Sequence, residues 1–394
     1  MIYTLLTKLF LKFFLKGTSM KLTCMQSNLS KGLATVGRAV ATRSTIPETQ
    51  NVLIATDNGR LKLTATNLEV AITTWIGAQI EQEGSLSIPA RMFGDFTNSL
   101  PDQKVEIEFI PNPIGIKIHC ANFDAQINGL DSENYPPIPN ITDGPKVSIS
   151  ATQFKSSLAR VKFAVATDES RPALTGVKLD IKENEFTLAS ADGFRLSIEK
   201  GQCDSTIDEE ISIIIPQRTV NEIFNLIGNE SGEVDITVTE QKSQALFKFG
   251  DVEVVTQLIQ GNFPDYERLI PTEEGTVTKI NRSEMLDSTN AAKVFARDGS
   301  GIIRVISESI NGEGSMRIMS QAEEVGSNES RIKAEISGEG TQIAFNSRFL
   351  SDILSVLEGD VIELETLSSS SPGVFRSEAN QGFLHIIMPM FVQW

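Results

Sequence analysis

Hydrophobic positions recur with the same helical spacing at three points of the chain. Each time, an apolar run leads into a Pro-x-Arg or Asn-x-Arg anchor, and apolar residues follow two, five and nine positions after the arginine. Spacings of three and four residues place side chains on one face of an α-helix, so each segment predicts a helix with one buried face. An acid stands four positions after each arginine, one helical turn away on the surface. The three sets are Arg91 with Phe93, Phe96, Leu100 and Asp95; Arg218 with Val220, Ile223, Ile227 and Glu222; and Arg348 with Leu350, Ile353, Leu357 and Asp352.

The anchors begin at Pro89, Pro216 and Asn346, which indicates one domain fold used three times. An alternating strand follows each helix, and an earlier helix is predicted in each repeat. Two Pro-containing runs cannot continue a helix or a central strand and predict linkers, and Asn58-Gly59 predicts a hairpin turn. We therefore expect an α+β fold with two helices packed on antiparallel sheets in each repeat. The predicted ranges are strands 105–109, 234–238 and 361–364; earlier helices 28–42, 151–166 and 282–296; linkers 135–139 and 262–266; and domains 20–142, 143–271 and 272–394.

The charges of the chain are distributed unevenly. The formal net charge is −16, which argues against a nucleic-acid partner if it is taken as a sum. The first two of the earlier helices nevertheless contain bases and no acids, and a basic helical face can neutralise phosphates without reading their sequence. No recognition helix or stacking platform accompanies these bases, so we expect any DNA contact to be independent of sequence. The candidate residues are Lys31, Arg38, Arg43, Lys155 and Arg160 from the earlier helices, with Arg91 and Arg218 from the anchors.

The first 19 residues differ in character from the rest. They are apolar and basic, with Lys8, Lys12 and Lys16 spaced four apart and no acids. The segment is too short and too charged to span a membrane, and lysines interrupt its apolar part where a signal peptide would be continuous. We interpret residues 1–19 as an N-terminal extension outside the fold, with Met20 as the working start.

Cysteine and histidine are scarce and dispersed. Cys24, Cys120 and Cys203 have neither paired nor metal-ligand spacing, which favours a reduced, cytoplasmic setting. His119 and His385 each lie in an apolar strand-like run, so both are interpreted as packing residues. The sequence offers no nucleophile with its base and no ligand cluster. We therefore expect no catalytic residue, no metal and no cofactor.

The chain resembles a known family, the bacterial DNA polymerase III beta subunits, which are sliding clamps. The resemblance runs from Met20 to about Met390, and it depends on several motifs in this order and spacing. They are Ile88-Pro89-Ala90-Arg91, Ala191-Asp192-Gly193-Phe194-Arg195-Leu196, Gly261-Asn262-Phe263-Pro264-Asp265-Tyr266 and Met388-Pro389-Met390.

The resemblance implies a head-to-tail homodimeric ring of six similar domains that encircles duplex DNA. Such a ring acts as a processivity factor that tethers the replicative DNA polymerase, without being an enzyme. It also implies that Arg43, Arg91 and the loop ending at Arg171 contact DNA, and that Phe123, Val294 and Phe295 contribute to the ring-closing interface. The expected partners are duplex DNA, the polymerase catalytic subunit, the clamp loader and other clamp-binding peptides, with no membrane.

The resemblance further implies an apolar groove between domains two and three, where partner proteins insert short peptides. Unbranched Met side chains adapt to different ligands, and an open apolar groove can hold Leu or Phe anchors. This chain departs from the common family pattern at Ala191, at Phe194 and in its longer tail, 391–394, which we expect to lean over the groove. The groove residues are Leu174, Gly193, Phe194, Arg195, Leu196, Pro264, Arg268, Leu269, Ile386, Ile387, Met388, Pro389 and Met390.

Two other classes of function stay open from the residues alone. A secreted binding module would use residues 1–19 as an export signal, and cleavage near Ser19 would distinguish it. An enzyme would need a constellation of reactive side chains. Pairs such as Glu323-Glu324 are more typical of surface charge.

Overall fold

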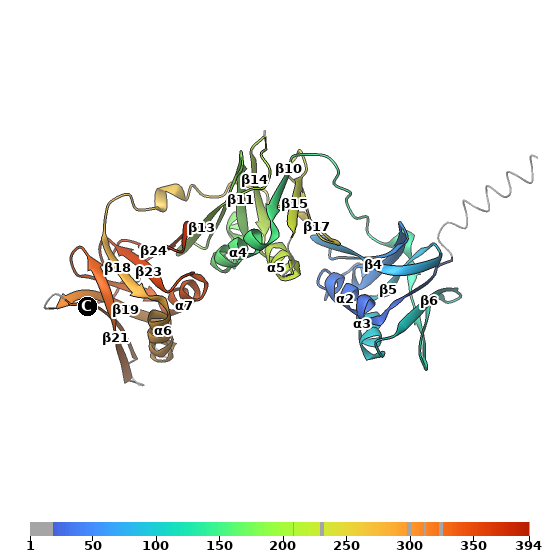
Figure 1. Cartoon of the computed structure of the whole chain (residues 1–394), viewed down its shortest axis with the longest axis horizontal. Helices are drawn as coiled ribbons and strands as arrows, with labels where there is room; N and C mark the ends of the chain where they lie inside the picture. Colours follow the sequence, from blue (N-terminus) through green and yellow to red (C-terminus); the bar gives the residue numbers. More distant parts are fainter. Residues whose placement is uncertain are drawn as a thin grey trace, which may run out of the picture. The chain divides into compact units, whose positions relative to one another are not determined.

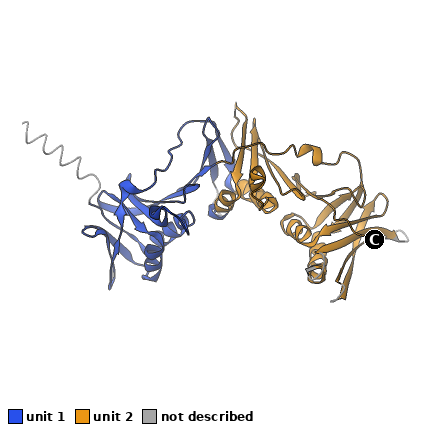
Figure 2. Cartoon of the chain, turned by 180° about the vertical axis from the view of Figure 1, so that it is seen from behind, with its two compact units in different colours: residues 1–151, 225–257 blue, residues 152–224, 258–394 orange. Residues whose placement is uncertain are grey.

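The computed structural model describes residues 19–207, 209–228, 232–297, 301–310, 313–322 and 326–393 (Figure 1). The predicted N-terminal extension therefore lies outside the described residues except for Ser19, as do Glu323, Glu324 and Trp394. The chain forms two compact units (Figure 2). Unit 1 contains residues 1–151 and 225–257, and unit 2 contains residues 152–224 and 258–394.

Unit 1 is built on one continuous 13-stranded sheet. The path β10-β15-β16-β17-β4-β1-β6-β7-β8 runs through it, and β2, β3, β5 and β9 branch from β4. Strand β17 pairs antiparallel with β4, so a strand of the second repeat extends the sheet of the first. The strands are β1 Lys21–Met25, β2 Asn51–Asp57, β3 Arg60–Thr66, β4 Val70–Gln82, β5 Ser85–Pro89, β6 Lys104–Pro111, β7 Ile114–Cys120, β8 Phe123–Asn128, β9 Leu130–Asp131, β10 Lys146–Ser150, β15 Glu233–Val238, β16 Gln244–Phe249 and β17 Val252–Gln257.

Unit 2 repeats this plan with a 12-stranded sheet. Its order is β14-β11-β12-β13-β25-β24-β23-β18-β21-β20-β19-β22, and the pairing of β13 with β25 joins the second repeat to the third. The strands are β11 Gly176–Lys182, β12 Glu185–Ala191, β13 Arg195–Gln202, β14 Ile211–Pro216, β18 Thr276–Asn281, β19 Ile302–Ile310, β20 Glu313–Ala322, β21 Gly326–Ser337, β22 Thr341–Asn346, β23 Val361–Thr366, β24 Gly373–Ser377 and β25 Asn380–Ile387.

The helices pack on these sheets in pairs. Helix α2 contacts α3 and β4, and α6 contacts α7, β20 and β21. Six α-helices lie in the described residues, together with short 3-10 turns at 47–50, 132–134, 162–164, 172–175 and 267–269. The helices are α2 Gln26–Gly37, α3 Ala90–Ser99, α4 Ala151–Val161, α5 Gln217–Leu226, α6 Arg282–Arg297 and α7 Ser347–Val356.

The predicted apolar stripes form the buried faces of α3, α5 and α7. Phe93, Val220, Ile223, Leu350 and Ile353 are all almost completely buried. Phe96 is the exception. It is partly exposed, whereas Thr97 beside it is fully buried and its carbonyl accepts a hydrogen bond from the Gln26 amide.

The anchors begin their helices in two ways. Pro89 is the N-cap residue of α3, with a φ of −51° and no side-chain cap hydrogen bond, whereas Asn346 caps α7 by accepting hydrogen bonds from the N–H groups of Arg348 and Phe349. Both solutions suit a helix start, because proline presets the backbone and an asparagine oxygen satisfies unpaired donors. The predicted hairpin is also confirmed, since Asn58 and Gly59 both have positive φ between β2 and β3.

Two predicted helix ends were wrong. The helix predicted over 28–42 ends at Gly37, where Ala39 and Val40 form turn hydrogen bonds to Val36 and Gly37. Arg38 therefore caps α2, and Arg43 lies in the loop beyond it. The helix predicted over 151–166 ends at Val161 and continues only as the 3-10 turn. Gly37 disfavours continuation of α2, because glycine has an entropic cost in a helix. The apolar periodicity alone does not reveal this cost.

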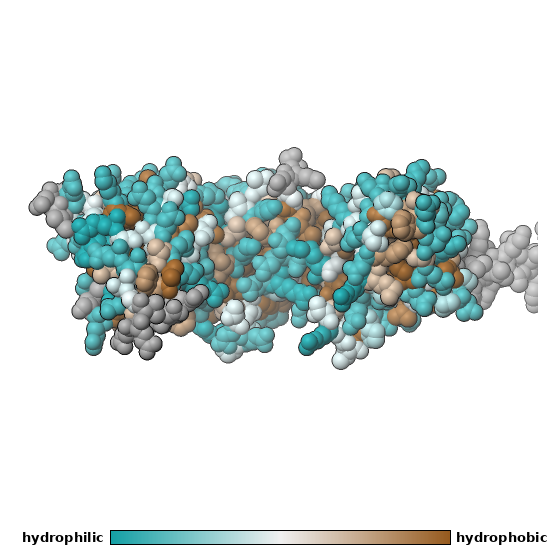
Figure 3. Space-filling model, turned by 90° about the horizontal axis from the view of Figure 1, so that it is seen from below, coloured by the Kyte–Doolittle hydropathy of each residue, from teal (hydrophilic) through white to brown (hydrophobic). Residues whose placement is uncertain are grey.

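None of the helices in the described part of the chain has the length and apolarity needed to cross a lipid bilayer. In the view of Figure 3 the visible surface is largely hydrophilic, with apolar residues among the polar ones.

Candidate peptide groove and nucleic-acid interface

A tight turn between β12 and β13 organises the predicted groove residues of unit 2. Asp192 Oδ1 accepts hydrogen bonds from the backbone N–H groups of Phe194 and Arg195, at 2.9 and 3.0 Å. Gly193 has a φ of 93°, and a Cβ there would come within 2.7 Å of Arg171 Nη1. Glycine is thus required both by the backbone conformation and by the arginine packed on it. The turn presents Phe194 to solvent with 62 % of its surface exposed.

Arg195 is a buried ionic link rather than a groove surface. Its Nε and Nη1 atoms pair with Asp192 Oδ2 and Asp352 Oδ2, at 2.9 and 2.7 Å, and Nη2 donates to the Phe163 carbonyl at 2.7 Å. The guanidinium also lies 4.3 Å from the centroid of the Phe349 ring. Only 5 % of the residue is exposed. Arg195, which was predicted to be a groove residue, therefore positions the turn against α7 as a buried side chain.

The end of strand β25 lies beside the turn. The Met388 N–H donates to the Phe194 carbonyl at 2.8 Å and so extends the β13–β25 ladder by one step. Ile386 and Ile387 precede it and are buried, whereas Met388 is 42 % exposed. The pairing of β24 with β25 ends at Gly373 and Ile387, so Met388 lies beyond the strand that flanks Ile386 and Ile387.

An apolar cluster lies beneath these residues. It contains Leu174, Leu196 and Ile386, which are among the predicted groove residues, and also Tyr266 and Val374, which are not. Tyr266 belongs to the Asn-Phe-Pro-Asp-Tyr motif, so the sequence did carry a signal for it. At the rim, Phe194, Leu269 and Met388 are exposed large apolar residues. We use the name Met388 surface for the exposed residues Phe194, Pro264, Leu269 and Met388 together with the partly exposed Pro389 and Met390.

Two other predicted residues border the Met388 surface. Arg268 is highly exposed and pairs with Asp265 at 2.7 Å. Arg171, predicted from the resemblance to contact DNA, donates to the Asp192 carbonyl at 3.0 Å and packs on Gly193. The structure thus places Arg171 beside the groove turn.

The C-terminal tail does not follow the predicted course over the groove. The Met390 N–H donates to the Ala344 carbonyl in β22 at 2.8 Å, and Arg304 Nη2 donates to the Gln393 carbonyl at 3.0 Å. These bonds hold the described tail along β22 and β19, with Phe391 88 % exposed.

His385 lies under the same site and is completely buried. Its Nδ1 is 2.7 Å from Ser197 Oγ, and its ring packs against Phe163 and Phe383. Burial, together with the charge of Arg195, lowers the pKa of His385 well below 6.5. The interpretation of His385 as a packing residue is confirmed. For His119 it was wrong, because that side chain is exposed and pairs with Asp124 at 3.0 Å.

Several predicted DNA-contacting residues are exposed. Lys31 lies on α2, and Arg38 and Arg43 follow it, all with exposed side chains. Arg91 on α3 is almost fully exposed, and its Nε is 3.7 Å from Asp95, the predicted acid one turn on. Arg218 on α5 is also exposed.

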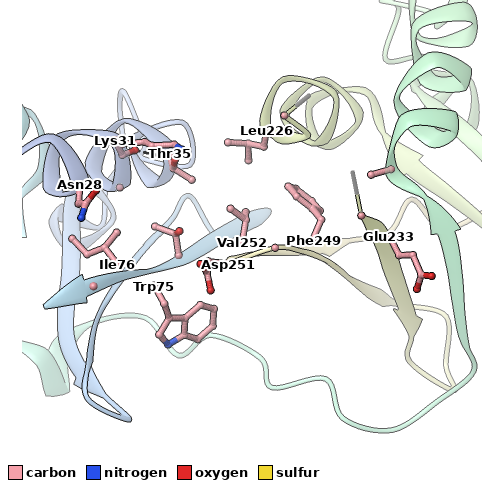
Figure 4. A pocket seen from close by; sticks show the side chains of 17 residues that line it. Asn28, Lys31, Thr35, Trp75, Ile76, Leu226, Glu233, Phe249, Asp251 and Val252 are labelled. Atoms are coloured by element: carbon pink, nitrogen blue, oxygen red, sulfur yellow. Dashed lines mark hydrogen bonds between the residues drawn. The ribbon is translucent and has the colours of Figure 1, made fainter. Parts of the chain in front are cut away.

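Lys31 borders a cavity of about 470 Å³ in unit 1. Asn28 and Thr35 of α2 line it from the same helix, and Figure 4 shows Val252 and Phe249 of the β16–β17 hairpin facing them. Asp251 also lines this cavity, so the lysine sits in a mixed electrostatic environment.

The other predicted bases of the second repeat are held by protein groups. Arg160 is 6 % exposed and forms ion pairs with Glu199 and Glu358, so it cannot present its charge to DNA, and that prediction was wrong. Lys155 Nζ lies 5.6 Å from the centroid of the Phe224 ring, and Lys162 Nζ lies 3.6 Å from it. Burial lowers the pKa of Lys162.

Two of the three predicted interface residues are exposed apolar side chains. Phe123 begins β8 and is 48 % exposed, and Val294 on α6 is 61 % exposed. Phe295 beside it is partly buried and lies 3.9 Å from the position that a Cβ at Gly326 would occupy.

Comparison with known proteins shows which family shares this architecture. Family models match the N-terminal domain of the DNA polymerase III beta subunit at residues 20–139, its central domain at 148–265 and its C-terminal domain at 267–391. The chain is 30 % identical over 380 residues to the beta sliding clamp of Bacillus subtilis, with 94 % of this chain and 99 % of that protein covered. It is 29 % identical over 375 residues to the clamp of Synechococcus elongatus, with the same coverage.

Solved structures of this family have the same fold as this chain. The Bacillus subtilis DNA polymerase sliding clamp has a TM-score of 0.90 at 29 % identity, and the Thermotoga maritima DNA polymerase III beta subunit has a TM-score of 0.86 at 25 % identity. Each comparison covers 95 % of this chain and 100 % of the other. The α+β fold of three tandem domains with antiparallel sheets is therefore confirmed.

The buried histidine generates a testable pH dependence. Below pH 6.5 the unfolded chain binds a proton at residue 385 that the folded chain excludes, so protons favour unfolding. We expect the free energy of unfolding of unit 2 to fall as the pH is lowered from about 7 to about 5. The fall should be smaller in His385→Gln and His385→Phe.

Denaturant titration at each pH measures this effect, and His119→Gln, which replaces the exposed histidine, is the matched control. Parallel pH profiles for the wild-type protein and both His385 variants would contradict the assignment.

Proposed function

Because the chain belongs to the DNA polymerase III beta subunit family, we propose that it works as two copies closed head to tail around duplex DNA. It is a sliding clamp, a processivity factor in DNA replication, and not an enzyme. The proposal concerns how this chain closes the ring, contacts DNA and holds partners.

An unequal use of strand edges carries the proposal for the ring. In unit 1 the first half of β4 pairs with β17 and its second half with β1, and in unit 2 β13 pairs with β25. The matching strand of the first repeat, β8, has a partner on one side only within the described residues. In the third repeat, the second half of β21 pairs with β18, while its first half pairs only with β20 among the described strands. Among the described strands, each copy thus has two unpaired edges: one along β8 and one along the first half of β21.

Head-to-tail pairing would use both edges at once. A β8 edge of one copy meeting the β21 edge of another gives a heterologous contact that closes when the rotation suits. Phe123 at the start of β8 and Val294 on α6 are exposed apolar residues available for this contact. Closure also covers edges that would otherwise be open to unspecific pairing.

Electrostatics supports DNA in the ring. The net charge of −16 discourages binding to the outside, whereas Lys31, Arg38, Arg43, Arg91 and Arg218 are exposed on or after helices. Their contacts would neutralise phosphates without reading bases. A closed ring tolerates such weak contacts because its retention on DNA is topological.

The Met388 surface supports peptide docking. Flexible methionine and aromatic side chains over a firm apolar floor suit varied apolar anchors. We propose that the polymerase catalytic subunit, the clamp loader and other partners bind here through short peptides. The Arg195 link would fix the position of Phe194 while the methionines adapt.

Three further parts of the proposal follow from the sequence. The domain borders are placed at 20–142, 143–271 and 272–394, and residues 1–19 precede the fold. We place the chain in the cytoplasm, which the free thiols of Cys24, Cys120 and Cys203 support. No membrane partner is proposed.

Substitution of Phe123 tests the ring. Phe123→Asp would place a charge in the apolar contact, so we expect the dissociation constant of the dimer to rise about a hundredfold. Light scattering over a concentration series measures the mass, which should be twice that of the chain for the wild-type protein. Val361→Asp, at an exposed apolar residue of β23, is the control. An unchanged dimer in Phe123→Asp would rule out this interface.

A second prediction concerns DNA. Arg43→Ala and Arg91→Ala should each weaken binding to duplex DNA for all sequences and reduce the slope of log affinity against log salt by about 1. Fluorescence anisotropy with two unrelated duplexes measures this. Lys182→Ala removes an exposed lysine of β11 that pairs with Glu210 and serves as the control. Salt slopes equal to that of the wild-type protein would remove both arginines from the DNA path.

A third prediction concerns the Met388 surface. Met388→Ala combined with Leu269→Ala should weaken binding of a peptide from the cognate polymerase subunit by about tenfold or more, because apolar contact area is lost. The dimer mass should not change. Isothermal titration calorimetry measures the affinity, with Val361→Ala as the control. Wild-type affinity in the double variant would reject the assignment.

A further inference from the structure

A second cavity lies in unit 1, at the junction of the first and second repeats. It has a volume of about 270 Å³ and is lined by the β3–β4 turn, the Pro136–Pro139 run and the end of β17. Its lining includes the buried apolar residues Val70, Ala71 and Val255, and Ile138 and Leu246 pack against Ala71 and Val255. This size suits one or two side chains of a peptide better than a whole small molecule.

The backbone of this junction copies that of the Met388 surface. Asn67 Oδ1 accepts hydrogen bonds from the N–H groups of Glu69 and Val70, at 3.1 and 2.9 Å, as Asp192 does for Phe194 and Arg195. Leu68 has a φ of 78° where Gly193 has 93°.

The strand beside the turn, β17, pairs with it in the same way as β25 does at the Met388 surface. The Gln257 N–H donates to the Glu69 carbonyl at 2.9 Å, as Met388 does to Phe194 at 2.8 Å. Val255 lies opposite Ala71, as Ile386 lies opposite Leu196. The two junctions are therefore equivalent in construction and differ mainly in side chains.

Those side chains change the chemistry of the rim. Glu69 stands where the other junction has Phe194, and Gln257 stands where it has Met388. The floor is smaller, because Ala71 replaces Leu196. The rim of unit 1 is thus more polar and acidic, over a shallower apolar floor.

Leu68 points to a ligand independently of this comparison. A leucine with positive φ is an outlier that costs on the order of 1–3 kcal/mol, and such strain persists where it has a use. Glycine would relieve the strain, as it does at residue 193. Instead the position holds a large apolar side chain that is 48 % exposed at the mouth of a cavity.

The charge at the rim indicates what would bind. Glu69 is exposed and forms no ion pair within the described residues, and no lysine or arginine lines the cavity. The amides of Gln244 and Gln257 can donate to and accept from a peptide backbone. An apolar floor beside one carboxylate complements an aliphatic side chain next to a base.

We propose that this junction is a second docking site, for an extended peptide that carries an aliphatic residue beside lysine or arginine. The aliphatic side chain contacts Leu68, Ala71 and Val255, and the base pairs with Glu69. The site extends the partner-binding role proposed for the Met388 surface to a different peptide chemistry, and it does not depend on that surface.

The experiment uses the full-length protein and two labelled probe peptides. One is acetyl-Gly-Lys-Leu-Ile-Lys-Gly-amide with a photo-crosslinking group, and the other has glutamate in place of both lysines. We expect the lysine probe to bind more tightly and to crosslink to residues 66–71 or 136–139. Leu68→Gly should lower its affinity about fivefold while keeping or raising thermal stability, because glycine accepts the backbone conformation.

Charge reversal provides the decisive comparison. Glu69→Lys should weaken the lysine probe about fivefold and strengthen the glutamate probe, whereas Glu240→Lys, an exposed acid of the β15–β16 turn, should change neither. Met388→Ala should leave the lysine probe unaffected even if it abolishes binding of a polymerase peptide. Crosslinks confined to 386–390, or affinities insensitive to both Leu68→Gly and Glu69→Lys, would overturn the proposal.

Discussion

Pairing of strands across repeat borders is the constraint on which the structure depends. Strand β17 completes the sheet of the first repeat through β4, and β25 completes that of the second through β13. Backbone hydrogen bonds need no particular side chains, so the same joint can be built twice from different sequences. Among the described strands, β8 and the first half of β21 each keep one open edge, and a second copy is the natural source of the missing strands.

The same joint creates the two surfaces that we propose as docking sites. Where a strand of one repeat ends beside the turn of the preceding one, the ladder stops and the next side chain becomes exposed, as at Met388. The two junctions use the same turn geometry, with an Asn or Asp oxygen holding two backbone N–H groups. The two proposed sites then differ in a few rim residues, because the apolar Phe194 and the charged Glu69 occupy equivalent places.

Buried charge has a positional role in unit 2. Arg195 ties the turn of the second repeat to Asp352 on a helix of the third, and Arg160 ties α4 to Glu199 and Glu358. A buried pair of this kind contributes little net stability but is costly to break, so it favours one arrangement over others. The basic residues left exposed are then those outside such links.

The repeat, its helices and their apolar faces could be predicted from the residues alone, because periodicity is a local property of neighbouring residues. The burial of Phe93, Ile223 and Ile353 was predictable for that reason, whereas the groove residues were proposed from family resemblance. Tertiary structure decided which polar residues are available. Arg160 lies 39 residues from Glu199 and 198 from Glu358, and no local pattern can show that these carboxylates bury its charge. The same holds for the burial of Arg195, for the path of the C-terminal tail and for the second junction. Each depends on strands that meet only after folding.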